Sequence, residues 1–331
     1  MHFARTEEQD ELAVVVRSLL DRHSDSAAVR AAVESGSGYD ETLWRALCEQ
    51  VGVAALAVPE EYDGFGATLV ETATVLEELG HNLTPSPLLA TAIAATALQL
   101  HAEPEHRAAL LPRVAAGEIA TVALDDLVLD APAAGVVLRV RDGRLELLTD
   151  PEVERVGAMD QTLRFGRVGA TDGEAIGEVT GDGPLRDVAL ALASALQVGA
   201  AQRGLDMTVA YSKERVQFGR PIGSFQALKH RMADMLVLVE ASRSASWGAT
   251  AAAAAYVGDA TQGNAAILRR RSAVARSYCS DALDHVASET VQLHGGIAIT
   301  WEHDAQLLFK RAHALSQLFG PAHRHRASLL P

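Results

Sequence analysis

The chain has 331 residues, 48% hydrophobic and 22% charged, which is typical of a soluble globular protein with more than one structural unit. Its formal charge of −14, with scattered basic residues, argues against a nucleic-acid partner because a phosphate backbone would be repelled. The two cysteines, Cys48 and Cys279, have neither a disulfide nor a metal-ligand spacing, so we expect reduced thiols and no metal site.

The first third of the chain is predicted to be helical. Apolar residues recur three and four positions apart from Thr6 onward, and acidic residues stand near the start of this stripe. Further helices are predicted over the stretches 40–50, 68–79, 85–100 and 104–116. A signal peptide would need positive charge where these acids stand, and no run in the chain is apolar enough to span a membrane. We expect a cytoplasmic protein with an α-helical domain over residues 1–117.

Between Ile119 and Val179 the pattern changes to short alternating runs. Residues 136–140 and 144–148 flank Asp142-Gly143, a pair suited to the two-residue type I′ turn of a β-hairpin. This pattern predicts a small middle β domain over residues 118–182.

Long helical patterns return after Pro184. They cover residues 185–213, 222–257, 260–287 and 300–317, and each is long enough to cross a domain. We predict an antiparallel four-helix bundle domain over residues 183–331. The order of α, β and α segments lacks the βαβ alternation of a doubly wound sheet, so the expected fold class is mostly α with a small central β domain.

The connection between the first two bundle helices carries polar and aromatic residues. It contains Arg215, Gln217 and Phe218 in the sequence R-V-Q-F-G. An arginine at a helix end, beside exposed backbone N–H groups, an amide and an aromatic ring, can bind a pyrophosphate and cover a flat ring system. The alternative is an interhelical turn whose arginine caps helix carbonyls, and the chemistry of these residues alone does not decide between the two.

A second connection contains paired glycines, Gly295 and Gly296, shortly after Gln292. Backbone amides in such a turn can approach an anionic ligand closely, because no side chain intervenes. A plain helix-breaking turn is the alternative.

Together the two connections resemble the acyl-CoA dehydrogenase family, which has R-x-Q-F-G-x-P-I, then F-Q and A-D-M, and later Q-x-H-G-G. The matching residues here are Arg215–Ile222, Phe225-Gln226, Ala233–Met235 and Gln292–Gly296. The stretch Val58–Gly66 is similar to the family's N-terminal P-E-E-Y-G-G-x-G segment. The resemblance implies the family fold of an N-terminal α domain, a β domain and a C-terminal four-helix bundle.

The same resemblance implies a flavin cofactor. In the family these motifs contact the diphosphate and adenine half of FAD across a subunit interface. Carried over to this sequence, the contacting residues are Arg215, Gln217, Phe218, Gln292 and Gly296. The resemblance implies an FAD shared with a partner subunit that holds most of it.

The family's catalytic base is not found at either of its usual positions. Family members remove the α-proton of an acyl-CoA with a carboxylate while the β-hydride goes to the flavin. Counting without gaps from the paired glycines places Phe319 at the usual glutamate position, and Ala189 stands at the other known position, on the preceding helix. Asp187 lies about 200° round that helix from Ala189 and points elsewhere. No catalytic residue is predicted.

The middle region departs from the family as well, since it is shortened and lacks the T-E-P-x-A-G-S-D and W-I-T-N segments. The combination resembles the shortened, base-less subunits of actinobacterial α2β2 acyl-CoA dehydrogenases that act on steroid side-chain CoA thioesters. It implies a heterotetramer with a full-length acyl-CoA dehydrogenase partner that supplies the base, an acyl-CoA substrate, and an electron acceptor such as an electron-transfer flavoprotein.

Two alternatives remain open at this stage. One is a self-sufficient homo-oligomeric dehydrogenase that uses Asp187 or an unrecognised carboxylate as its base. The other is a non-catalytic scaffold that has kept the fold for its interfaces.

Overall fold

The computed structural model describes residues 5–179 and 183–330. The N-terminal part is helical, as predicted. Thr6 caps its first helix, because its side chain accepts from the Gln9 N–H while Gln9 caps the Thr6 N–H in return. The helices here are α1 (Glu7–His23), α2 (Ser26–Glu34), α3 (Glu41–Ala46), α4 (Leu69–His81), α5 (Leu88–His101) and α6 (Pro104–Ala115), with a π turn at Leu47–Val51 and a 3-10 turn at Glu60–Tyr62.

The middle part forms short strands in two sheets within the described residues. One has the order β1-β3-β4-β7 and the other β2-β6-β5. The bounds are β1 (Ala120–Ala123), β2 (Val128–Leu129), β3 (Val136–Arg141), β4 (Arg144–Leu148), β5 (Val153–Val156), β6 (Phe165–Val168) and β7 (Gly173–Glu178). Asp142 (φ 52°) and Gly143 (φ 74°) connect β3 to β4, and these positive angles confirm the predicted type I′ turn.

The C-terminal part is a bundle of long helices, and it confirms the predicted fold class. Its elements are α7 (Gly183–Glu214), α8 (Gln226–Gly258), α9 (Gln262–His294), α10 (Ala305–Gln317) and α11 (Ala322–Ala327). A short hairpin, β8 (Val216–Gln217) and β9 (Arg220–Pro221), joins α7 to α8, and a 3-10 turn covers Ile222–Ser224. Helix α8 therefore begins at Gln226, four residues after the predicted start at 222. Helix α9 ends at His294, seven residues after the predicted end at 287.

Helix α7 is the centre of the molecule, buried along most of its length between α4, α8 and α9. It approaches α4 closely because glycines face the contact. A Cβ added to Gly199 would lie 1.8 Å from the Glu77 carbonyl oxygen, and one added to Gly80 would lie 2.3 Å from that of Leu196. The N-terminal helices and the bundle therefore share one core.

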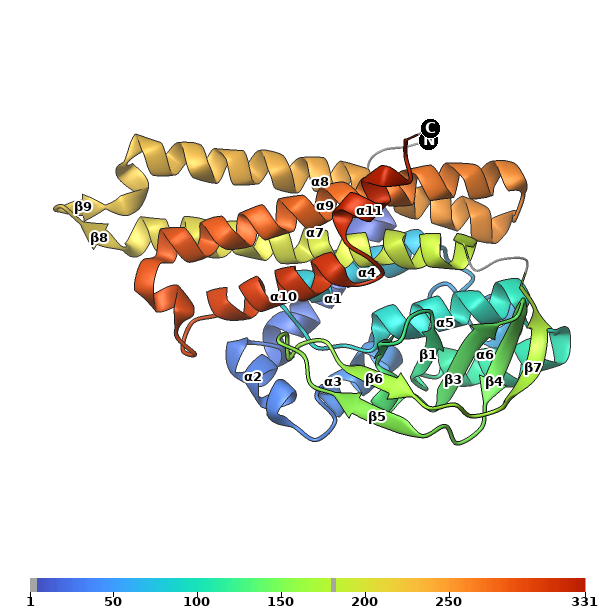
Figure 1. The fold of residues 1–331 in the computed structure, drawn as a ribbon. Coiled ribbons are helices and arrows are strands. Elements are labelled where there is room, and N and C mark those ends of the chain that lie inside the picture. The colour runs from blue at the N-terminus through green and yellow to red at the C-terminus, as the bar shows by residue number, and fades with distance from the viewer. Residues whose placement is uncertain (1–4, 180–182, 331) are drawn as a thin grey trace.

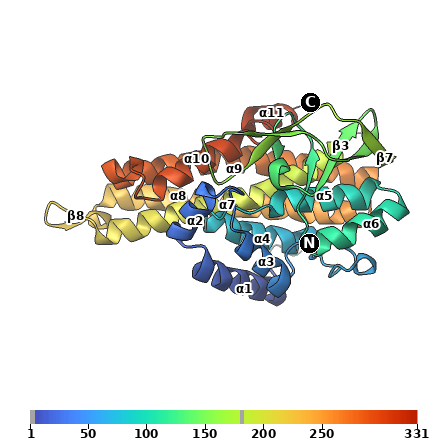
Figure 2. The same cartoon turned by 90° about the horizontal axis from the view of Figure 1, so that it is seen from below.

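The sheets lie beside one end of the bundle, and the β8–β9 hairpin projects from the opposite end (Figure 1, Figure 2). In the described part of the chain, no helix is long and apolar enough to cross a bilayer. The predicted boundary at residue 182 falls outside the described residues, and the division into three domains stays a prediction.

Candidate flavin-contacting surface and the Phe319 cavity

The β8–β9 hairpin presents Phe218 at its tip. Val216 pairs with Pro221 and Gln217 with Arg220, and the turn residues Phe218 (φ 53°) and Gly219 (φ 77°) both adopt the left-handed conformation. Such a conformation costs a non-glycine residue about 1 kcal/mol, and Phe218 is nonetheless 91% exposed. Its ring packs edge-to-face with Phe225, with ring centroids 6.1 Å apart. Phe218 therefore adopts a strained backbone conformation in which its aromatic ring is exposed to solvent.

The polar side chains of the hairpin are also free to bind. Arg215 is exposed, and among the described residues its guanidinium has no hydrogen bond or ion pair. The side-chain amide of Gln217 donates only to the Val216 carbonyl, at 2.8 Å. Arg220 instead lies over the Phe225 ring at 4.1 Å. The interpretation of Arg215 as a helix cap thus has no support in its contacts.

The second sequence-predicted segment forms an open turn at the end of α9. Gln292 and Gly296 are exposed, and the Gln292 side chain has no hydrogen-bond partner in the described part of the chain. Gly295 has φ 66°, whereas Gly296 has an ordinary angle and no atom within 4 Å of an added Cβ. Packing within this chain therefore does not explain the glycine at 296. An approaching ligand or chain would explain it.

The structure brings both segments to the same end of the bundle. Tyr211, in the last turn of α7, stacks on His294, the last residue of α9, with ring centroids 4.4 Å apart. The five predicted residues therefore lie at the same end of the bundle, and we refer to them together as the hairpin–glycine surface: Arg215, Gln217, Phe218, Gln292 and Gly296. It offers a guanidinium, two amides, a flat ring and open backbone, a donor set that fits an aromatic nucleotide with a diphosphate.

The position predicted to lack a base is filled by packing. Phe319 (φ 59°) follows α10, is half-buried, and lines a cavity of about 10 Å³ with residues of α5 and of the β1–β2 segment. That volume holds at most one water molecule. The other lining residues are Ala90, Ile93, Thr121, Val122, Leu124, Asp125, Leu127, Val128 and Leu129.

A buried arginine fixes the segment that carries Phe319. Arg276 of α9 is fully buried and donates through Nη2 to the carbonyls of Leu315 and Leu318. Burial lowers the pKa of Arg276 to about 10, so the side chain keeps its charge at neutral pH. The end of α10 is thereby held against the bundle, with Phe319 turned into the cavity.

Asp125 is the one carboxylate that lines the Phe319 cavity among the described residues. Arg186 holds it through both oxygens, each at 3.1 Å from a guanidinium nitrogen, and also donates to the Leu124 carbonyl. No motif in the sequence marks Asp125, because its partner Arg186 lies 61 residues further along the chain. Both carboxylate oxygens of Asp125 are occupied by the Arg186 guanidinium.

Asp187 lies outside the Phe319 cavity. Its Oδ2 is 3.9 Å from the Arg269 Nε of α9, and burial raises the pKa of Asp187 to about 6, with Arg269 and Arg186 opposing the shift. Ala189, the alternative base position, is fully buried in α7. Asp187 is therefore a largely buried carboxylate that faces Arg269 and does not line the Phe319 cavity.

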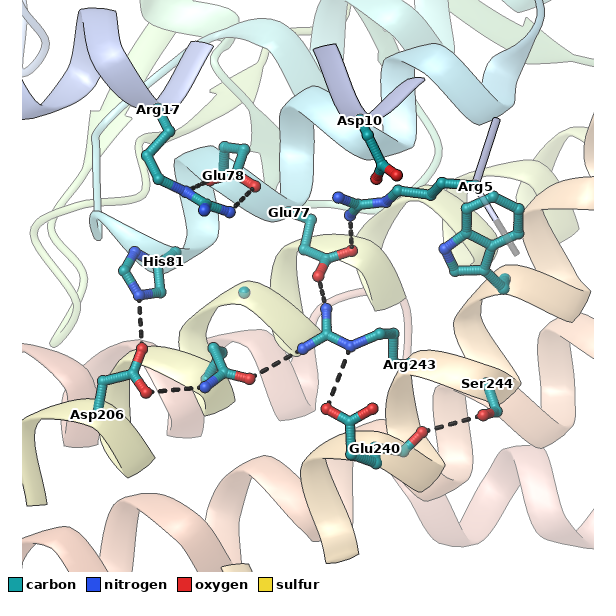
Figure 3. A pocket seen from close by; sticks show the side chains of 13 residues that line it. Arg5, Asp10, Arg17, Glu77, Glu78, His81, Asp206, Glu240, Arg243 and Ser244 are labelled. Carbon is teal, nitrogen blue, oxygen red and sulfur yellow. Dashed lines mark hydrogen bonds and ion pairs between the residues drawn. The ribbon is translucent and has the colours of Figure 1, made fainter. Parts of the chain in front are cut away.

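A larger cleft of about 730 Å³ lies on the flank of the bundle, between α1, α4, α7 and α8 (Figure 3). Its charges are paired with one another: Arg17 with Glu78 at 2.7 Å, Arg5 with Glu77 at 2.7 Å, and His81 with Asp206 at 3.0 Å. Arg243 completes the network through Glu77 and Gln202. No residue of the hairpin–glycine surface lines this cleft, and its ion pairs link α1 to α4 and α4 to the bundle helices α7 and α8.

Comparison with known proteins assigns the family. The profile of the acyl-CoA dehydrogenase N-terminal domain matches residues 6–118, and that of the C-terminal domain matches residues 190–330. The acyl-CoA dehydrogenases IpdE2 of Mycobacterium tuberculosis and Mycolicibacterium smegmatis are 47% and 46% identical. The alignments cover 94% and 96% of this chain, and 93% and 96% of those proteins.

Solved structures agree with this assignment. A chain of the Tcur3481-Tcur3483 steroid ACAD (G363A variant) superposes with a TM-score of 0.87 at 29% identity, covering 98% of this chain and 96% of that one. A chain of the ChsE4-ChsE5 complex from Mycobacterium tuberculosis gives 0.84 at 25% identity, covering 99% and 98%. The chain belongs to the acyl-CoA dehydrogenase family.

Proposed function

We propose that this chain is a subunit of a heteromeric, flavin-dependent acyl-CoA dehydrogenase, to which it contributes flavin-contacting surface but not the catalytic base. The observation that carries the proposal is the contrast between its two half-sites. The hairpin–glycine surface leaves its binding groups exposed, and among the described residues the side chains of Arg215 and Gln292 have no hydrogen bond or ion pair. By contrast, a phenyl ring, Phe319, lines the small cavity at the position that motif counting assigns to the base.

The expected reaction is α,β-desaturation of an acyl-CoA, in which FAD, when bound, accepts the β-hydride. Proton abstraction by a positioned carboxylate contributes about 10²–10⁴ in rate, so it cannot be omitted. A phenyl ring at 319 and a methyl group at 189 cannot accept a proton. We therefore assign the base to a full-length acyl-CoA dehydrogenase partner in a heterotetramer.

This chain's own residues would act by binding and orientation. Arg215 would pair with the flavin diphosphate, the amides of Gln217 and Gln292 would donate hydrogen bonds, and the Gly296 backbone would allow close approach. Phe218 would cover the adenine-bearing half of the cofactor. Each is exposed in the isolated chain, as binding across an interface requires.

The similarity to chains of a steroid ACAD and of the two-protein ChsE4-ChsE5 complex supports a heteromeric assembly. By the same argument we propose a steroid side-chain CoA thioester as substrate and an electron-transfer flavoprotein as electron acceptor. A degraded half-site in this chain would leave room for a bulky acyl group at the shared site.

The test is to purify the chain alone and after co-expression with full-length acyl-CoA dehydrogenases of the same genome, beginning with adjacent genes, and to count FAD per polypeptide. We expect a flavin-poor isolated chain, and a heteromer with one FAD per unlike pair. One FAD per copy in the isolated chain would favour the self-sufficient enzyme. A heteromer in which the flavin does not depend on Arg215 would favour the scaffold.

A further inference from the structure

Three rings meet where the β8–β9 hairpin and the 3-10 turn Gly295–Ile299 leave the bundle. We call this 3-10 turn the glycine turn. The three rings are Tyr211 in the last turn of α7, His294 at the end of α9, and His303 in the segment before α10. The ring centroids of Tyr211 and His294 are 4.4 Å apart at 26°, and those of His294 and His303 are 4.6 Å apart at 55°. Tyr211 meets His303 edge-on at 6.4 Å. We call this group the ring cluster.

The ring cluster is attached directly to both parts of the hairpin–glycine surface. The Tyr211 carbonyl accepts from the Arg215 N–H at 2.9 Å, and the Arg215 carbonyl accepts from the Ile222 N–H at 2.8 Å, which closes the base of the hairpin. His294 stands between Gln292 and Gly296 in the chain. A displacement of either ring would therefore move the segment that it anchors.

Few other contacts fix the two segments relative to each other. Within the described residues, no hydrogen bond or ion pair joins residues 215–221 to residues 292–300. Below the rings, Thr208 and Thr290 share the Gly204 carbonyl and bond each other at 3.1 Å, which fixes the helices but not the segments beyond them. The ring cluster therefore joins the ends of α7 and α9 at the point where the two segments leave the bundle.

The chemistry of His294 argues that its ring serves more than packing. Its Nδ1 donates to the Thr290 carbonyl at 2.7 Å, and the Met207 backbone of α7 also lies within reach of the buried ring. The imidazole is thus held between α9 and α7 by polar contacts that an aliphatic residue would not make. Stacked rings restrict both the separation and the orientation of the elements that carry them, which an aliphatic side chain does not.

We propose that Tyr211, His294 and His303 are positioning residues that hold the hairpin and the glycine turn at the separation required to grip one flavin diphosphate. The inference rests on the proposed function for its ligand, although the geometry that it describes belongs to this chain alone. None of the three rings needs to touch the cofactor.

The test compares Tyr211→Leu, which keeps apolar bulk but removes the ring, with Tyr211→Phe, which keeps the ring. Spin labels at Val216→Cys and Ile299→Cys, both exposed positions, report the distance between hairpin and glycine turn in the isolated chain. The native Cys48 and Cys279 should label slowly, because burial raises the pKa of each thiol to about 12. FAD affinity is measured in the co-purified heteromer.

We expect Tyr211→Leu to broaden the distance distribution and to raise the FAD Kd about five- to tenfold, and Tyr211→Phe to restore both values. Should Tyr211→Leu not fold, His303→Asn serves instead, because it removes a ring while keeping an acceptor for the Ala305 N–H. Unchanged distances and unchanged FAD affinity in the ring-deleted chain would overturn the inference. A heteromer that binds no FAD would instead overturn the proposed function, while the distances would still decide whether the rings position the segments.

Discussion

Phe218 and Phe319 have the same local conformation and opposite surroundings. Each adopts a positive φ, 53° and 59°, and each precedes a glycine that does the same. Phe218 lies 91% exposed at the tip of a hairpin, whereas Phe319 is turned into a cavity of about 10 Å³. The same strained dipeptide thus exposes one ring to solvent and packs the other against α5 and the β1–β2 segment. Under the proposed function, the first ring would meet the cofactor, and the second would stand where other family members carry the base.

Replacing Arg215 by alanine should weaken FAD binding by the heteromer, and this is the largest effect that we expect. A charge-assisted, bidentate contact to a diphosphate contributes about 2–3 kcal/mol, so the FAD Kd of the heteromer should rise about 30- to 150-fold. Thermal unfolding of the isolated chain should not change, because the Arg215 side chain makes no hydrogen bond or ion pair with any residue that the structure describes. Lys229→Ala, an exposed cation in the first turn of α8, is the matched control. Equal losses in the two variants would indicate a nonspecific charge effect.

Replacing Phe319 by alanine should lower the stability of the chain without changing FAD binding. The half-buried ring would leave a cavity, and the free energy of unfolding should fall by about 2 kcal/mol, less than for a fully buried phenylalanine. Urea unfolding measures this loss. FAD per heteromer should stay the same, and a well-folded variant that had lost its flavin would contradict the assignment of Phe319 to packing alone.

Replacing Asp187 by asparagine tests whether this carboxylate is only a buried group or is the catalytic base. Burial raises the pKa of Asp187 to about 6, so the folded state binds this proton more tightly than the unfolded state does. Its contribution to stability is therefore present at low pH and lost as pH rises through about 6. Asp187→Asn should raise the free energy of unfolding by about 1–2 kcal/mol above pH 6 and leave it unchanged near pH 4.

The activity of the heteromer should not depend on Asp187. A fall of about a hundredfold or more in a folded Asp187→Asn heteromer would identify it as the base and revive the self-sufficient alternative. Asp125→Asn is the companion variant, because Asp125 lines the Phe319 cavity.

Phe218→Gly should have the smallest effect on stability. Glycine adopts the left-handed conformation without strain, and the exposed ring contributes little packing, so the free energy of unfolding should change by less than about 1 kcal/mol. FAD affinity should nevertheless fall in the heteromer. A large loss of stability in the isolated chain would mean that the ring serves the fold rather than a ligand.

Local chemistry explains which features were predictable from the sequence. The Asp142-Gly143 turn follows from the preference of these residues for positive φ, and the helices follow from their apolar period. The apolar period predicts an end of α9 seven residues too early, whereas the glycine at 295 correctly indicates a helix end at His294.

Long-range contacts explain what the sequence did not reveal. Arg276 reaches carbonyls 39 and 42 residues further along the chain, and no local pattern announces such partners. The ion pair of Asp125 with Arg186 spans 61 residues. His294 lies within the Q-x-H-G-G match and Tyr211 lies four residues before Arg215, yet only the folded bundle shows that their rings stack.

The most direct test asks whether this chain, which offers flavin-contacting surface, also supplies a catalytic base. The homogeneous isolated chain is supplied with FAD and mixed anaerobically with the acyl-CoA that the heteromer desaturates. We predict no bleaching of the flavin absorbance by the isolated chain and rapid bleaching by the heteromer. Bleaching by the isolated chain at a rate comparable to the heteromer would show that this polypeptide supplies its own base, and would contradict the account.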